Sequence, residues 1–241
     1  MTTPAEQNTG CRATPWIQYD NLRLFRVPAG SAYVYATSHM AIDADGAPNA
    51  YAPDDTGLDA LANAGFPAGN WQAILVPDPL DHGRPFVQAS GPFAGFFVSQ
   101  TALQDSSKRL TDPARYVDAT AIPYIVFPGN FLKLPGTGTL GDVGFAFNLN
   151  NGKSTPFIVA DVGPSAAELG EVSIKLAEAL GGTEVNPRTG AGIPEGPTAY
   201  VVFPHSHATP KWPLSLGDLT TRAAAELARC GGAEALLPCV R

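Results

Sequence analysis

The chain has few charged residues, which make up 15% of its 241 positions, and its lysines and arginines form no cluster. The net charge of -7 disfavours nucleic acid as a partner, because phosphates attract basic clusters. No run of about 18 apolar residues occurs, so the sequence predicts no membrane span. Composition therefore argues against nucleic-acid-binding and membrane-spanning proteins.

Cysteine is also scarce, and Cys11, Cys230 and Cys239 lie near the two ends of the chain. No Cys-x-x-Cys pattern occurs, which argues against a metal or redox motif, and we expect neither a metal nor another cofactor. One disulfide is expected. A bond between Cys230 and Cys239 is the first choice, and a bond from Cys11 to a C-terminal cysteine is almost as strongly favoured.

Glycine and proline are plentiful instead, with 25 and 23 residues, and hydrophobic residues make up 44% of the chain. This composition is too apolar for a disordered chain and is typical of a fold with many turns and short strands. Strands and helices do not alternate in the pattern, so a doubly wound sheet is not expected. We predict a mainly β (α+β) fold with a β-barrel core, or else a sandwich, with one inserted helix and a C-terminal helix.

Apolar runs and alternation predict strands at residues 22–27, 32–36, 71–76, 93–98, 121–127 and 200–203, and a hairpin of 141–149 with 153–159. Apolar residues at intervals of three and four predict helices over 166–180 and 219–229. Residues 43–72 indicate a long loop with a short helix near 57–64. We expect an arm (1–20), a catalytic domain (21–215), and a C-terminal helix with a cysteine-bearing tail (216–241).

Two carboxylates form the most informative pattern. The apolar run 157–160 ends in Asp161, the pair Gly163-Pro164 breaks it, and Glu171 follows at the head of the predicted helix 166–180. Glycoside hydrolysis needs one carboxyl group that donates a proton and one that activates water across a gap. A glutamate partly desolvated against a core would have the raised pKa of such an acid. Alternatively, the two residues only stabilise a turn and a helix start.

Five segments in order resemble the chitosanases of glycoside hydrolase family 75. The motif Asp161-x-Gly-Pro, followed by Leu169-Gly-Glu171-x-Ser173, is similar to the catalytic segment of that family. Four further segments resemble family motifs: residues 40–46 (MAIDADG), 99–103 (SQTAL), 118–126 (DATAIPYIV) and 141–143 (GDV). The chain differs from the family pattern at Ala41, at Ala44 and in an insertion around residues 61–92.

The resemblance implies a β-barrel core and endo-hydrolysis of the β-1,4 linkages of chitosan with inversion at the anomeric carbon. It implies that Glu171 is the acid and Asp161 the base, or the reverse. The expected substrate-binding residues are Asp43, Asp45, Gln100, Asp118 and Tyr124. For Asp43, Asp45 and Asp118 a turn held by aspartate side chains is the alternative. The expected partner is a polysaccharide, bound by a monomer.

Two other functions stay open: hydrolysis of the glycan strands of peptidoglycan, and glycan binding by a non-catalytic relic of the fold. Residues 1–7 lack the basic and apolar regions of a secretory signal. We expect a secreted protein, with a cytoplasmic protein or specialised export as alternatives. His205 and His207 form half of a metal pattern, but a solvated loop is the preferred interpretation. Asp142 is interpreted as a turn residue.

Overall fold

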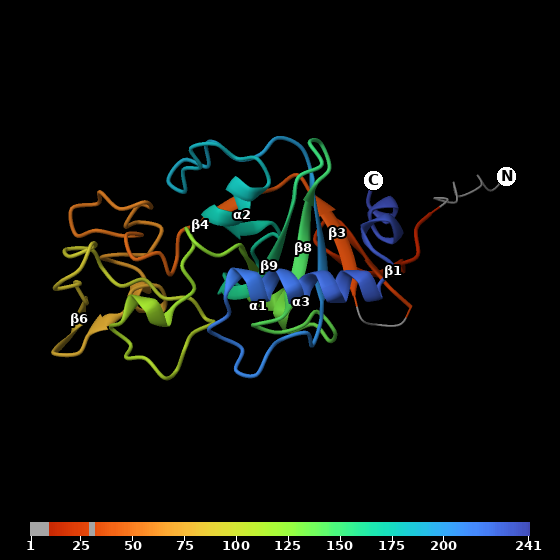
Figure 1. Ribbon diagram of the computed structural model, residues 1–241. Coiled ribbons are helices and arrows are strands. Elements are labelled where there is room, and N and C mark those ends of the chain that lie inside the picture. The colour runs from red at the N-terminus through yellow and green to blue at the C-terminus, as the bar shows by residue number, and fades with distance from the viewer. Residues whose placement is uncertain (1–9, 29–31) are drawn as a thin grey trace.

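The computed structural model describes residues 10–28 and 32–241, and its centre is one open sheet of nine strands (Figure 1). In spatial order the strands are β1 (Thr14–Tyr19), β2 (Leu22–Arg26), β3 (Tyr33–Thr37), β11 (Thr198–Phe203), β8 (Val143–Asn148), β9 (Ser154–Gly163), β7 (Tyr124–Pro128), β10 (Glu171–Ser173) and β4 (Ala41–Asp43). The mainly β class is confirmed. The barrel is wrong, because the edge strands β1 and β4 do not pair to close the sheet.

The remaining elements are short except for one helix. They are the hairpin β5 (Pro77–Asp78) with β6 (Asp81–Pro85), the helices α1 (Gly129–Leu132), α2 (Ile174–Ala179) and α3 (Leu216–Arg229), and the 3-10 turns at Trp71–Ala73, Pro113–Arg115, Ala233–Ala235 and Leu237–Cys239. The predicted hairpin is confirmed as β8 with β9, and the predicted C-terminal helix as α3.

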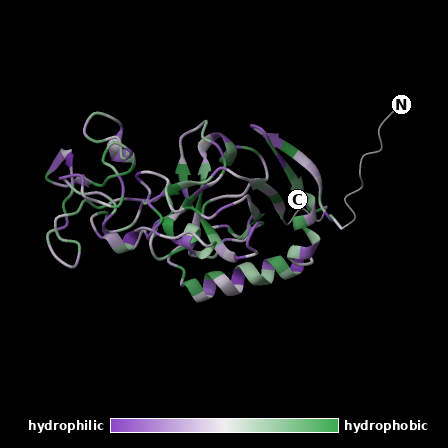
Figure 2. Cartoon of the chain, turned by 90° about the horizontal axis from the view of Figure 1, so that it is seen from above, coloured by the Kyte–Doolittle hydropathy of each residue, from purple (hydrophilic) through white to green (hydrophobic). Residues whose placement is uncertain are grey.

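Both faces of the sheet are covered, which explains why its central strands are continuous apolar runs. Tyr200 and Val202 of β11 belong to the core on the side of α2, whereas Val201 and Phe203 belong to the core on the opposite side. The helix α3 packs on β8 and β9 on that second side, with Leu219 buried. Figure 2 shows the hydrophobic residues concentrated in these central strands.

A long segment between β4 and β7, residues 44–123, lies beside the sheet and covers the rest of the second face (Figure 1). Tyr51, Trp71 and Leu103 of this segment share one core with Val126 and Ala160 of the sheet. Backbone hydrogen bonds between turns hold the segment together, and its only named strands are β5 and β6. We call residues 44–123 the extension.

Several expected elements do not form in or near the extension. Residues 71–76 contain a 3-10 turn, and residues 71–76 and 93–98 contribute only isolated bridges, Leu75 with Ser99 and Val87 with Phe97. No helix forms at 57–64. The apolar residues Trp71, Leu75 and Phe97 instead pack into the core that the extension shares with the large sheet.

The predicted terminal segments belong to the body of the fold. Residues 14–19 of the expected arm form β1, so that prediction is wrong there; residues 1–9 lie outside the described part. A disulfide joins Cys11 to Cys239, so the first-choice pairing of Cys230 with Cys239 is wrong. Within residues 10–28 and 32–241, no helix has the length and apolarity needed to cross a membrane.

Candidate active site

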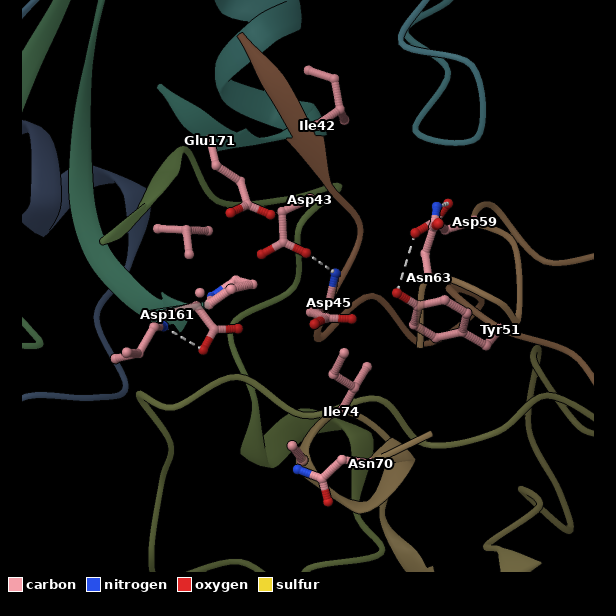
Figure 3. A pocket seen from close by; sticks show the side chains of 15 residues that line it. Ile42, Asp43, Asp45, Tyr51, Asp59, Asn63, Asn70, Ile74, Asp161 and Glu171 are labelled. Carbon is pink, nitrogen blue, oxygen red and sulfur yellow. Dashed lines mark hydrogen bonds between the residues drawn. The ribbon is translucent and has the colours of Figure 1, made fainter. Parts of the chain in front are cut away.

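A cavity of about 510 Å³ lies where the extension meets the second face of the sheet. Five carboxylates line this cavity (Figure 3). Among the residues that the structure describes, no lysine, arginine or histidine lines it. The carboxylates are Asp43, Asp45, Asp59, Asp161 and Glu171. The cavity therefore concentrates negative charge in a partly desolvated space, and a cationic ligand complements it best.

Asp161 and Glu171 stand at one level of the sheet with β7 between them. Val126 of β7 pairs with Asp161 of β9, and its neighbour Ile125 pairs with Val172 of β10, which places Glu171 beside Val126. Strands lie about 4.8 Å apart, so two strand spacings separate the two backbones by about 9.5 Å. Both side chains line the same cavity. Both residues thus contribute a carboxyl group to one cavity, and their catalytic roles stay a prediction.

An irregularity in β9 turns Asp161 into the cavity. Ile125 pairs with Val159, but the next residue, Val126, pairs with Asp161, so Ala160 is an extra residue. Regular pairing would place Ala160 opposite Val126 and Asp161 on the other face of the sheet. A bulge that redirects a side chain in this way is a frequent feature beside active sites.

Glu171 lies in a strand, which corrects the predicted helix start. Residues 171–173 form β10, parallel to β4, and α2 begins only at Ile174 with Ser173 as its N-cap. The predicted helix over 166–180 is therefore reduced to Ile174–Ala179. Strand geometry sends Glu171 to the cavity and the next residue, Val172, into the core on the side of α2.

The segment 99–103 positions two of the acids. The backbone N–H of Ala102 donates to Asp161 Oδ1 over 3.0 Å, and the N–H of Val162 donates to the same oxygen over 2.7 Å. The Ser99 hydroxyl donates to Asp45 Oδ1 over 3.0 Å. Gln100, a predicted substrate-binding residue, does not line the cavity; its amide donates to the carbonyl oxygen of Gln72.

Asp43 and Asp45 belong to a turn held by an aspartate side chain, which is the alternative interpretation, and both also line the cavity; their binding of substrate stays a prediction. The N–H of Asp45 donates to Asp43 Oδ1 over 2.8 Å, and both carboxylates line the cavity. Gly46 follows with a φ of +76°, and a Cβ there would lie 2.2 Å from the carbonyl oxygen of Val117. Only glycine fits this close approach.

The other two predicted binding residues do not line the cavity. Tyr124 is fully buried beneath it, and its hydroxyl donates to the carbonyl oxygen of Asp45 over 3.0 Å. Asp118 lies at a separate depression. Its carboxylate accepts hydrogen bonds from Thr120, which agrees with the alternative interpretation of Asp118 as a turn residue. Tyr124 thus supports the site from below, and Asp118 lies outside it.

Sequence reasoning missed Asp59 and the arginine that places it. The Asp59 carboxylate accepts hydrogen bonds from Tyr51 Oη and Asn63 Nδ2, and all three residues line the cavity. Arg188, from the loop after α2, donates to the carbonyl oxygens of Gly57 and Asp59. No sequence pattern links residues 129 positions apart, so this contact was not predictable.

Burial and mutual repulsion raise the pKa of the acids. Burial, followed by the charges of Asp43 and Asp59, raises the pKa of Glu171 to about 8. Burial raises the pKa of Asp43 to about 6, although hydrogen bonds from Asp45 and Tyr124 oppose the shift. Burial and the Asp43 charge raise the pKa of Asp161 well above its usual range. The free site therefore holds protons at neutral pH.

Three of the acids have the spacing of metal ligands. One carboxylate oxygen each from Asp43, Asp45 and Asp161 lies within 4.8 Å of the others, the one such group in the described residues. Oxygen ligands of this kind suit Mg²⁺ or Ca²⁺. Their oxygens already accept hydrogen bonds from Ser99 and from backbone N–H groups.

The histidine loop is held by a buried carboxylate. Asp142, interpreted from the sequence as a turn residue, is fully buried and accepts the N–H groups of Thr139, His205 and His207. The His207 ring lies 3.0 Å from Asp142 Oδ1. Residues 205–207 form a loop with His205 exposed, as expected, and the backbone of this loop folds around the Asp142 carboxylate.

Comparisons with known proteins add no relative: no family model matches the chain, and a search of curated proteins finds no match.

Proposed function

We propose that the protein is an endo-acting, inverting glycoside hydrolase that cleaves the β-1,4 linkages of chitosan. The observation that carries the proposal is the placement of Asp161 and Glu171 at one level of the sheet, two strands apart, in one cavity. Inverting hydrolases hold their two carboxyl groups roughly 6.5–9.5 Å apart to leave room for water, whereas retaining enzymes need about 5 Å. The inverting course is part of the proposal, and the stereochemistry of the first product tests it.

Glu171 is the better proton donor. Its pKa of about 8 keeps it protonated at neutral pH, as a general acid requires. Within the described residues no backbone N–H donates to its carboxyl group, so little stabilises its ionised form. In the proposed reaction the Glu171 proton passes to the glycosidic oxygen as the bond from that oxygen to the anomeric carbon breaks.

Asp161 is the better base. Two N–H groups, of Ala102 and Val162, donate to its Oδ1, and hydrogen bonds of this kind favour the carboxylate form. Asp161 takes a proton from the water whose oxygen bonds to the anomeric carbon. One carboxyl group loses a proton and the other gains one, so the net charge of the site is unchanged across the step.

The acidic lining favours an amino sugar over a neutral one. Chitosan carries ammonium groups, and the cavity supplies five carboxylates without any basic lining residue in the described part of the chain. A bound ammonium group would also lower the pKa of Asp161, because opposite charge favours the ionised form. Substrate binding would thus ionise the base that the free site keeps partly protonated.

A panel digest tests the proposal. The purified protein is incubated with chitosan, chitin, cellulose and murein sacculi, and new reducing ends are measured. We expect chitosan cleavage that falls by about 10²–10⁴-fold in Glu171→Gln, the usual contribution of a general acid. Glu178→Gln is the matched control, since Glu178 lies on α2 outside the cavity and pairs with Lys175.

Three outcomes would contradict the proposed function. Wild-type activity in Glu171→Gln would remove Glu171 from the chemistry. Cleavage of sacculi but not of chitosan would make the protein a peptidoglycan hydrolase. Glycan binding without any new reducing ends would indicate a non-catalytic relic.

A further inference from the structure

A second pocket of about 500 Å³ lies within the extension. Three segments that are distant in sequence enclose it, around residues 46–48, 88–93 and 112–118. Within the described part of the chain it shares no lining residue with the candidate active site, although Asp45 lines the cavity and the next residue, Gly46, lines this pocket. Pockets of this size are typical sites for small ligands. We call it the second pocket.

Gln88 contributes a fixed hydrogen-bond acceptor to the second pocket. The residue is only 8% exposed, and its amide nitrogen Nε2 donates to the carbonyl oxygens of Pro48 over 2.6 Å and of Phe97 over 3.1 Å. Because both partners can only accept, the nitrogen must face them, and the same two bonds fix the amide oxygen Oε1. Among the described residues no group donates to Oε1. Buried polar atoms are normally paired, so Oε1 marks a position where a ligand can donate.

Two carboxylates line the same pocket, those of Asp112 and Asp118. The N–H of Ala114 donates to Asp112 Oδ1 over 3.0 Å, and Thr120 donates to Asp118 Oδ1 from its N–H and its hydroxyl. In both residues the other oxygen, Oδ2, receives no hydrogen bond from the part of the chain that the structure describes. No described lysine, arginine or histidine lines the pocket. A ligand that carries positive charge and donates hydrogen bonds therefore complements it best.

Two aromatic rings add an apolar surface to the second pocket. Tyr116 is buried and its hydroxyl donates to the carbonyl oxygen of Leu110 over 2.9 Å, so it offers its ring to a ligand. Phe93 is half-buried and packs edge-on against Phe96, with the ring centres 6.2 Å apart. Aromatic rings bind apolar C–H surface and attract cations to their faces. An amino sugar carries both a C–H face and an ammonium group.

We propose that the second pocket binds a glucosamine unit of the polysaccharide outside the cleavage site, with its ammonium group at Asp112 and Asp118 and a hydroxyl group donating to Gln88 Oε1. The choice of an amino sugar rests on the proposed function, whereas the acceptors and rings of the pocket do not. A second contact of this kind raises the effective concentration of linkages at the cavity. It also gives Asp118 a binding role away from the reacting carboxylates.

The test is an NMR titration of the full chain with glucosamine and, separately, with glucose, which has a hydroxyl in place of the ammonium group. The side-chain amide signals of Gln88 report on the second pocket, and those of Asn63 and Asn70 report on the cavity. Glucosamine should shift the Gln88 signals to saturation and bind there about tenfold more tightly than glucose, because hydrogen bonds to charged groups are stronger. Equal affinity for the two sugars at Gln88 would overturn the proposal.

A variant locates the charge that the ligand recognises. Asp112→Asn removes one carboxylate and keeps the oxygen that accepts a backbone N–H two residues later in the chain. It should weaken glucosamine binding at Gln88 by about tenfold and leave the response of the cavity unchanged. The matched control is Asp81→Asn in the β5–β6 hairpin, because Asp81 is exposed and also accepts an N–H two residues later. If both variants bind glucosamine alike at Gln88, the assignment of the second pocket is wrong.

The remaining outcomes separate this inference from the proposed function and from another occupant. If glucosamine does not shift the Gln88 signals, the inference is wrong even when chitosan is cleaved. If it shifts them as expected but no glycan is cleaved, the second pocket still binds amino sugars and the hydrolase proposal fails. Nα-acetyl-lysine amide, a probe for a cationic peptide, should bind at Gln88 more weakly than glucosamine. Tighter binding of that probe would make a peptide the occupant and overturn the proposal.

Discussion

Stability should decrease as the pH rises, because the native state holds a proton on Glu171 that the unfolded chain has lost. The pKa of Glu171 is about 8 in the folded protein against an ordinary value of 4.5. Between these values the native state binds more protons than the unfolded state, so the free energy of unfolding falls with pH. A difference of about 3.5 pH units at about 1.36 kcal/mol each gives about 5 kcal/mol.

Glu171→Gln removes this titration while keeping the shape of the protonated side chain. The variant and the wild type should be similarly stable near the ordinary glutamate pKa. The variant should then gain up to about 5 kcal/mol over the wild type as the pH approaches 9. Urea unfolding at a series of pH values, extrapolated to water, measures the difference. Glu178→Gln is the control and should follow the wild type.

Parallel stability curves for the wild type and Glu171→Gln across this range would refute the reasoning. They would mean that Glu171 is ionised in the native state, and the acid in the proposed mechanism would have no proton to donate.

Two further predictions concern the frame around the cavity. Cys11→Ser opens a loop closed across 228 positions by the bond to Cys239, and chain entropy predicts a loss of about 5 kcal/mol of stability. Urea unfolding checks this, and the reduced wild type should show the same loss. Arg188→Met removes the hydrogen bonds to the segment that carries Asp59, so KM for chitosan should rise several-fold while kcat changes less. Steady-state kinetics measures both constants. The control Arg84→Met, in the β5–β6 hairpin, should leave KM and kcat unchanged. If Arg188→Met and Arg84→Met have the same kinetics, the role of Arg188 is wrong.

The strands of the sheet interior were largely predictable because each is a long apolar run. Residues 200–203 and the hairpin around 148–152 gave correct predictions, since burial on both faces leaves few polar positions. The extension was not predictable in the same way. Its apolar residues lie in turns, and these turns are held by contacts with residues distant in the sequence. Such packing produces no regular spacing of apolar residues that sequence analysis could detect.

The carboxylates of the site were partly predictable. The pattern around Asp161 and Glu171 identified two cavity residues, but the apolar spacing of Leu169, Val172 and Leu176 imitated a helix at a three-residue strand. The bulge at Ala160 also leaves no trace in the sequence. Pairing with β7 and β4, which are distant in sequence, decides both features.

The stereochemistry of the first product tests the central claim most directly. Chitosan is digested in a proton NMR tube, and the anomeric signals of the new reducing ends are recorded before mutarotation. The account predicts the α-anomer from the β-linked polymer, because Asp161 and Glu171 flank room for a water. The β-anomer would contradict it, since retention requires carboxyl groups about 5 Å apart and a covalent intermediate.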